Sequence, residues 1–359
     1  MKNMKTSSLL RLIAFLLITV VLVGVVGVVS EGLENTPDDN SPATGNSNTQ
    51  TPPASDVPTV TLRYENYLSG LQCSYEESMQ KSLCYLMSPS SDMYGIQGAE
   101  LTIEVPLENG KSRLLVYTSD TDKLGKIGAI APMRGYMSTL FSSFGGILVH
   151  NGTDDTVNYQ APAADIPCID ISKSNAYSYS EGQGLHYTNG NLISNALEGL
   201  NIPYEENTAI KLPYVFPNSY DGVIRGQIQC QNVTVPNGTY GNVRLIYDIS
   251  SSQYRVESNG AMRMDYHSGD AVGYKNAFVL FCDTTTYERS DTTELVLELT
   301  SGGTGYYFTE GTMIKFIWSV NENGSLEFRD TTGQILIINR GASYITFCKT
   351  TQRNNVTIY

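Results

Sequence analysis

The sequence is poor in the residues on which several common functions depend. Its 359 residues include three histidines and one tryptophan, and 23 Lys and Arg are outnumbered by 36 Asp and Glu. The formal net charge of -13 and the lack of a basic stripe argue against a nucleic-acid partner, because phosphate binding needs clustered Lys and Arg. We interpret the acidic balance as a solvated protein surface.

Signatures of catalysis and metal binding are also missing. No G-x-S-x-G motif and no Cys-His-Asn arrangement supplies a nucleophile. The sequence does not exclude a pair of carboxylates that cleaves glycosides, because such residues need not be close in sequence. The six cysteines show no C-x-x-C spacing and no clustering with histidine, so we expect no metal site and no cofactor. Export would permit disulfides, and Cys73 with Cys84 and Cys282 with Cys348 are the candidate pairs; free thiols are the alternative.

The first thirty residues have the features of a membrane segment. Lys2, Lys5 and Arg11 precede an apolar run over 12–29, which is long enough to cross a hydrocarbon core. The basic flank predicts that this end stays in the cytoplasm and that the bulk of the chain is extracytoplasmic. A signal peptide cut after Ser30 is the alternative, but the length of the run favours an uncleaved single-pass anchor.

Composition divides the remainder of the chain. Residues 31–58 contain no Lys, Arg or aromatic side chain and are rich in Pro, Ser, Thr and Asn, so they predict a flexible linker. The rest is long enough for two domains. Their patterns predict an α/β domain over 59–208, a mixed sheet with helices, and an all-β domain over 209–352.

A hairpin is predicted in the first domain. The segment "AELTIEVPLENGKSRLLVYTS" has two β-type runs around Asn109-Gly110, a dipeptide typical of two-residue hairpin turns. With this dipeptide at the turn centre, Glu104 lies opposite Leu115 and shares a face with Arg113. This register permits an ion pair between Glu104 and Arg113. The pair is either part of a functional site or a weak ion pair on the surface.

A strand, a helix and a strand are predicted in "GKIGAIAPMRGYMSTLFSSFGGILVHNG". Pro132 suits the first position of a helix, the following apolar residues recur at helical spacing, and Gly145-Gly146 ends the pattern before the buried strand "ILVH". In such a βαβ unit the start of the helix and the end of the second strand lie at one edge of the sheet. We therefore expect Arg134 and His150 to face each other.

Two kinds of pattern follow. "DIPCIDIS" predicts a strand and "NLISNALEGLNI" a helix, and the loop between them carries His186. From about residue 211, nine short β-type runs are separated by turn residues without a long helical pattern. They predict an all-β sandwich or barrel-like domain, with Trp318 in its core rather than on a ligand surface.

Several segments resemble a known family. "IGAIAPMRGYMSTLFSSFGGILVHNG", "EVPLENGKSRLLVY" and "LHYTNGNLISNALEGLNI" are similar to the amino-terminal domain of the YerB lipoproteins, bacterial cell-envelope proteins of unknown activity. "GGTGYYFTEGTMIKFIWS" and "DTTGQILIINRGASYITF" are similar to the carboxy-terminal domain. Family members commonly carry a lipobox cysteine, which is absent here. The resemblance implies ligand-binding candidates at five polar positions: Glu104, Arg113, Arg134, His150 and His186.

Two functional hypotheses follow. A cation in the first turn of a helix is opposed by the helix dipole, so Arg134 needs an anion, either Asp154 or Asp155 of the chain or a ligand. The first hypothesis is a membrane-anchored binding protein that recognises an anionic or polysaccharide ligand, or an envelope protein, at the edge that carries Arg134 and His150. The second is a cell-wall-modifying hydrolase or transferase in which His150 or Glu104 acts as acid or base.

Overall fold

The computed structural model describes residues 63–89, 92–119, 125–153, 166–182, 184–204, 210–236, 242–288 and 293–359. These segments belong to one compact unit, Thr61–Tyr359. The predicted anchor at 12–29 and linker at 31–58 lie outside the described residues. Within the described ranges, no helix is both long and apolar enough to span a membrane.

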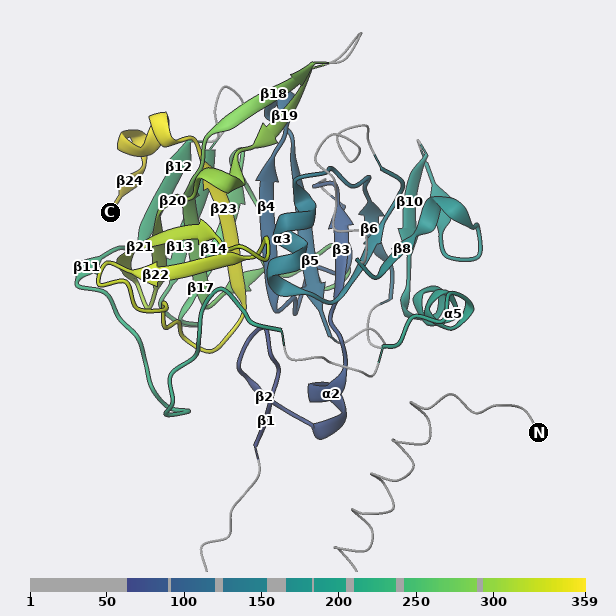
Figure 1. The fold of residues 1–359 in the computed structure, drawn as a ribbon, viewed down its shortest axis with the longest axis horizontal. Helices are drawn as coiled ribbons and strands as arrows, with labels where there is room; N and C mark the ends of the chain where they lie inside the picture. The colour runs from purple at the N-terminus through teal and green to yellow at the C-terminus, as the bar shows by residue number, and fades with distance from the viewer. Residues whose placement is uncertain are drawn as a thin grey trace, which may run out of the picture. The chain divides into compact units, whose positions relative to one another are not determined.

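The described chain is mostly β-structure with few helices, and its largest sheet mixes parallel and antiparallel pairs (Figure 1). Its main path follows the order β11 (Ile228–Gln229), β21 (Thr312–Val320), β20 (Gly303–Thr309), β17 (Asn276–Phe281), β23 (Ser343–Cys348), β4 (Leu101–Pro106), β5 (Ser112–Thr118), β3 (Leu83–Met87), β6 (Ile127–Ile130), β10 (Leu185–Thr188) and β9 (Tyr179–Glu181). Three strands join beside this path: β22 (Leu326–Asp330) on β21, β7 (Ile147–His150) on β3, and β8 (Cys168–Asp170) on β7.

Smaller elements surround this long sheet. A six-stranded sheet contains β15 (Ala261–Met262), β14 (Gln253–Ser258), β13 (Asn242–Asp248), β12 (Asn232–Pro236) and β24 (Thr357–Ile358), with β16 (Gly273–Tyr274) beside β14. Two ribbons pair β1 (Tyr64–Glu65) with β2 (Gln72–Cys73) and β18 (Thr284–Glu288) with β19 (Thr293–Leu297). The described α-helices are α2 (Tyr75–Met79), α3 (Met137–Phe144) and α5 (Gly190–Gly199).

The two halves of the chain meet inside the long sheet. Strand β23 lies between β17 and β4 and runs parallel to both. All six residues of β23 are buried, as expected for a central strand covered on both faces. The strands predicted for the second domain therefore extend the sheet of the first, and the β4–β23 pair joins them.

A hydrophobic layer covers each face of the long sheet. On one face, Leu140 and Phe144 of α3 belong to the same buried cluster as Leu115 and Ile345. Trp318 is 1% exposed in this cluster, which confirms its predicted core position. On the other face, residues of the six-stranded sheet pack against the long sheet. Val243, Leu245 and Val256 of that sheet cluster with Val279 and Phe281 of β17.

The predicted βαβ unit needs correction. Strand β6 is antiparallel to β3, whereas β7 is parallel to β3, so β6 and β7 run in opposite directions. Helix α3 begins at Met137 rather than Pro132, because the Met133 N–H donates to the carbonyl of Gly152 at 3.0 Å and Met133 pairs with Thr153. Gly145, with a positive φ of 66°, ends the helix as predicted.

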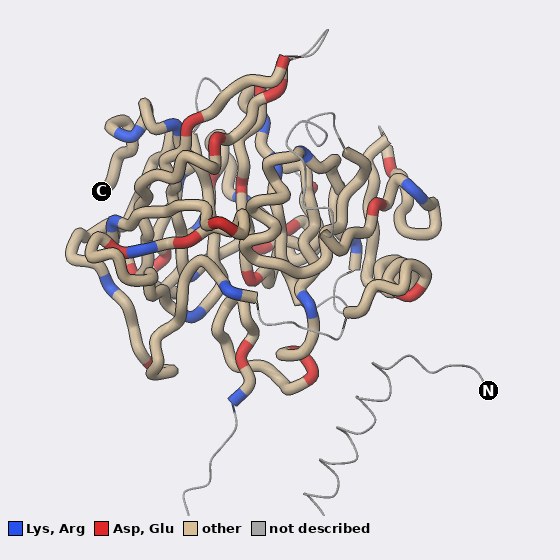
Figure 2. The backbone as a smooth tube through the Cα atoms, viewed as in Figure 1, with Lys and Arg blue, Asp and Glu red and all other residues tan. Residues whose placement is uncertain are grey.

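Most other predicted elements are present. The strand in "DIPCIDIS" is β8 and the helix in "NLISNALEGLNI" is α5. Two predictions differ from the structure. The run "QILIIN" forms no strand, because Ile335 and Ile337 make isolated bridges with Arg329 and Val215. The predicted loop that carries His186 contains strands β9 and β10. Figure 2 shows positive and negative residues interspersed along the described chain.

Candidate functional site

Three parallel strands at the centre of the long sheet organise the cavities of the molecule. Ser343 of β23 pairs with Leu101 of β4 and with Asn276 of β17, so the amino-terminal ends of the three strands lie together. Their carboxyl ends consequently meet at the opposite edge. One cavity lies at each edge, and the two cavities differ in size and in chemistry.

The cavity at the amino-terminal ends, here called the polar cleft, has a volume of about 840 Å³. Its wall includes 97–100 before β4, Lys275 before β17 and 340–342 before β23. Its other lining residues are Asn66, Ser69, Leu71, Gln72, Cys73, Glu77, Gln80, Ser119, Ser251, Gln253, Arg255, Val272 and Gly273. Most of these residues are polar, and both halves of the chain contribute to the wall.

The cations that line the polar cleft are paired with carboxylates of the chain. Arg340 contacts Glu65 at 3.1 Å between Nη2 and Oε1. Arg255 contacts Asp248 at 3.3 Å and donates to the carbonyl of Ala271 at 2.6 Å. The third cation, Lys275, forms an ion pair with Glu310. The positive charge of this wall is therefore compensated inside the protein.

The acidic residues of the polar cleft also have partners in the chain. Glu100 accepts a hydrogen bond from the Ser119 N–H at 3.1 Å, and Asn66 donates to the Ser119 hydroxyl at 2.7 Å. Glu77 accepts from the N–H of Ser74 at 2.8 Å in the capping box of α2. These carboxylates organise the wall locally.

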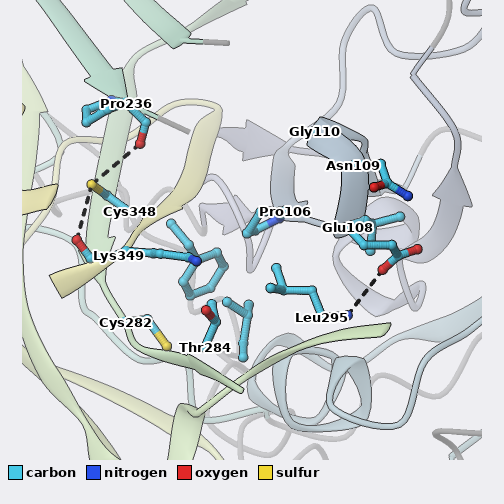
Figure 3. A pocket seen from close by; sticks show the side chains of 13 residues that line it. Pro106, Glu108, Asn109, Gly110, Pro236, Cys282, Thr284, Leu295, Cys348 and Lys349 are labelled. Carbon is cyan, nitrogen blue, oxygen red and sulfur yellow. Dashed lines mark hydrogen bonds between the residues drawn. The ribbon is translucent and has the colours of Figure 1, made fainter. Parts of the chain in front are cut away.

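The cavity at the carboxyl ends, here called the small pocket, has a volume of about 130 Å³. It is lined by Pro106, Leu107, Glu108, Asn109, Gly110, Pro236, Cys282, Thr284, Leu295, Leu297, Phe347, Cys348 and Lys349 (Figure 3). Burial raises the pKa of the Cys282 and Cys348 thiols to about 12. These thiols are protonated at neutral pH, so the pocket presents them as small apolar groups.

Glu108, which lines the small pocket, forms an ion pair with Arg134. Arg134 is buried and forms a bidentate pair with Glu108 at 2.6 and 2.7 Å, and Glu108 also accepts from the Leu295 N–H at 3.2 Å. Burial of Glu108 raises its pKa, but the hydrogen bonds from Arg134 and the backbone outweigh burial and lower the pKa to about 2. The anion that Arg134 needs is thus Glu108, while Asp154 and Asp155 lie outside the described residues.

Glu104 lies in the sheet interior, between the two cavities. It is 1% exposed and pairs with Arg263 at 2.8 Å, and it accepts hydrogen bonds from Tyr344 at 2.5 Å and Ser112 at 2.6 Å. Burial opposes its ionisation, but the Arg263 charge and the three donors hold the pKa of Glu104 below its usual range. This pair crosses from the long sheet to the segment that follows β15 of the six-stranded sheet.

Comparisons with known proteins agree with this fold. The N-terminal domain of a family described as protein of unknown function (DUF3048) matches residues 89–202, and its C-terminal domain matches residues 232–345. The crystal structure of YerB from Bacillus subtilis superimposes with a TM-score of 0.70 at 19% identity, covering 83% of this chain and 100% of that chain. This chain belongs to the YerB-like family. No curated protein matches it.

The polar positions carried over from the family lie in the N-terminal family domain but do not form one site. The predicted ion pair between Glu104 and Arg113 is wrong: Glu104 pairs with Leu114 rather than Leu115 across the hairpin, so Arg113 occupies the other face. Arg113 instead donates to the carbonyl of Pro132 at 2.5 Å. The turn is longer than predicted, with Asn109 inside a 3-10 turn at φ 57°.

His150 ends β7, and its surroundings explain its burial. It is 4% exposed, and its Nδ1 lies 2.8 Å from the carbonyl oxygen of Gly152. The backbone after β6 meets the backbone after β7, because the Asn151 N–H donates to the Ala131 carbonyl at 2.9 Å. The two predicted segments therefore converge, but Arg134 takes Glu108 as its partner while His150 bonds to backbone.

His186 lies on β10, near the edge of the long sheet. It is partly exposed, its backbone pairs with Ile130 of β6, and its Nδ1 lies 3.4 Å from the Ser180 hydroxyl on β9. It does not line either of the two cavities described above. Its contacts are those of a residue in an edge hairpin.

Neither candidate disulfide is formed. All six cysteines lie in described ranges, and each is a free thiol. The Cys282 N–H donates to the Cys348 carbonyl at 2.9 Å, but the two side chains belong to clusters on opposite faces of the sheet. Cys84 is fully buried, whereas Cys73 is partly exposed beside the polar cleft.

Sequence reasoning missed the residues that build the polar cleft. Gln97, Gln253, Lys275 and Arg340 come from turns or from β14, and no local motif marks them. Arg263 follows a two-residue strand and likewise carries no pattern. Within the described ranges, no three or more His, Cys, Asp or Glu side chains are grouped so that they could hold a metal ion.

Proposed function

We propose that this protein is a membrane-anchored, extracytoplasmic cell-envelope protein that binds an anionic or polysaccharide envelope ligand in the polar cleft. The anchor and the location rest on the sequence alone, on the apolar run over 12–29 behind a basic flank. The ligand class follows from the expected location together with the chemistry of the cleft.

The observation that carries the proposal is the polar cleft itself. A volume of about 840 Å³ is within the range of established ligand sites, and it is several times that of the small pocket. Both family domains contribute to its wall, through residues such as Glu100 and Lys275. A site between two domains is a common position for ligand binding.

The cleft supports ligand binding better than the edge that carries Arg134 and His150. Arg134 is fully engaged with a carboxylate of the chain, since both of its Nη atoms contact Glu108. His150 is buried and bonds to the Gly152 carbonyl. A ligand would have to break these contacts before it met either side chain.

The alternative of a wall-modifying hydrolase or transferase receives no support from Glu104. A general acid or base must reach the reacting group and must have a pKa near the working pH. Glu104 is enclosed by Arg263, Tyr344 and Ser112, and its pKa is held below the usual range. The geometry therefore favours the binding function.

A steric variant tests the proposal. We expect the purified full-length chain to bind envelope polymers in a co-sedimentation assay, and Gln97→Trp to remove binding because it places an indole in the cleft. Gln334→Trp is the matched control, since Gln334 is exposed outside the lining of this cleft. If both variants bind as the unmodified chain does while remaining folded, the cleft is not the binding site.

A further inference from the structure

The hydrogen-bonding groups of the polar cleft fall into two classes. Its cations and carboxylates are engaged with the chain, as in the pairs of Arg340 with Glu65 and of Lys275 with Glu310. Its glutamine carboxamides are not. Across the described residues, no side-chain hydrogen bond to protein is found for the four glutamines of the wall, which are Gln72, Gln80, Gln97 and Gln253.

The free carboxamides come from separate parts of the wall. Gln72 lies on β2, Gln97 precedes β4, and Gln253 begins β14. Each carboxamide offers two N–H donors and one carbonyl acceptor. They therefore present several donors and acceptors to one cavity, and none of them carries a charge.

The engaged charges weigh against a polyanionic ligand. A phosphate or carboxylate polymer binds through free cations, but here each cation of the wall already contacts a carboxylate. Arg340 is further held by packing over the rings of Phe216 and Tyr220, at 5.7 and 4.9 Å to the ring centroids. An anion would have to replace these existing contacts.

The apolar lining weighs against a peptide anchored by its side chains. Apart from Leu71, the apolar residues of the wall are small, such as Ala99, Val272 and Ala342, and they form no deep apolar pocket for a large side chain. Peptide recognition commonly uses apolar pockets or an open strand edge. The cleft instead lies at the ends of central strands β4, β23 and β17, where the edges are already paired.

From these contacts we infer that the ligand of the polar cleft is an uncharged glycan whose hydroxyl and acetamido groups bond to the glutamine carboxamides. This inference rests on the proposed function and narrows it, because it selects the neutral polysaccharide over the anionic polymer. The volume of about 840 Å³ accommodates a short oligosaccharide segment.

Titration calorimetry with three probes tests the inference on the full-length chain. The probes are a neutral tetramer of N-acetylglucosamine, poly-glutamate, and a neutral Gly-Ser peptide of similar length. We expect the tetramer to bind with a Kd that changes less than about twofold between low and high salt, since no ion pairs are exchanged. Gln97→Ala and Gln253→Ala each weaken binding about fivefold, as expected for one lost hydrogen bond. Gln334→Ala leaves the Kd unchanged.

Other outcomes separate this inference from the proposed function. If poly-glutamate binds with an affinity that falls steeply with salt, and Gln97→Trp blocks it, the cleft is a binding site but the glycan assignment is overturned. Tight binding of the peptide alone has the same meaning. If the tetramer does not bind while envelope polymers still bind in a manner sensitive to Gln97→Trp, the glycan assignment again falls. If neither the probes nor the envelope polymers bind, both the glycan assignment and the proposed function are overturned.

Discussion

The polar cleft and the small pocket lie at opposite ends of the same three strands, yet they differ in almost every property. Turns that precede β4, β17 and β23 contribute to the cleft, and most of its lining residues have polar side chains. The pocket lies beyond the carboxyl ends of these strands, and its lining includes residues of the β18–β19 ribbon and Glu108, the partner of Arg134.

The difference concerns which ends of the strands are accessible. Ligands of open α/β sheets commonly bind at the carboxyl ends of parallel strands. Here those ends are occupied by buried thiols and a rim ion pair, and the larger opening is at the amino-terminal ends. Which edge is accessible is therefore decided by the segments that cover it. Four measurements test the differences between these regions.

Thiol labelling should give the largest contrast. At pH 8 a thiol with a pKa of about 12 is ionised in roughly one molecule in ten thousand, whereas desolvation raises the pKa of exposed Cys168 to a smaller extent. Cys282 and Cys348 should therefore react with iodoacetamide at least about a hundredfold more slowly than Cys168. Peptide mapping by mass spectrometry measures each rate. Comparable rates at Cys168 and Cys348 would mean that the small pocket is open.

Removing the buried cation between the cavities should strongly destabilise the fold. Arg263→Met leaves the Glu104 carboxylate buried without its counter-ion, and we expect the free energy of unfolding to fall by about 3–5 kcal/mol in urea titrations. The control is Arg244→Met, whose ion pair with Glu257 is partly exposed, with an expected loss below about 1 kcal/mol. Equal losses in the two variants would refute a special role for the buried pair.

Two glycines of the polar cleft should differ in their tolerance of a side chain. Gly341 has a φ of +133°, and an added Cβ would lie 2.6 Å from the Lys275 Cβ, so Gly341→Ala should destabilise the protein by about 2–3 kcal/mol. Gly98 has a φ of +78° but open space around it, and Gly98→Ala should lose only about 1 kcal/mol. Thermal unfolding compares them. The reverse order would show that the wall yields at Gly341.

The smallest expected effect is the loss of folding stability at low pH through the Glu108–Arg134 pair. The pKa of Glu108 is lowered to about 2 in the folded state, so its stabilisation is present above its unfolded pKa of about 4.3 and is lost as the pH falls toward 2. Because the carboxylate is part-exposed, we expect a contribution of about 1 kcal/mol. Glu108→Gln should flatten the stability profile over this range. A profile identical to that of the unmodified chain would exclude the pair as the cause.

Local sequence patterns were sufficient to predict many of the strands, the end of one helix and the family relationship. Alternating apolar residues predicted strands such as β13 and β21, the glycine pair predicted the end of α3, and family segments predicted the YerB-like relationship. These features depend on residues that are close in sequence, so they can be recognised without knowledge of the rest of the fold.

The surroundings of Glu104 and the polar cleft are determined by the tertiary structure. The observed register of the hairpin that carries Glu104 differs by one residue from the predicted register, so Arg113 lies on the opposite face of the sheet. The partners of Glu104 are Arg263 and Tyr344, more than 150 residues away along the chain. The polar cleft likewise depends on the pairing of β4 with β23. Such contacts are set by strand pairing and layer packing over long separations, which no local pattern encodes.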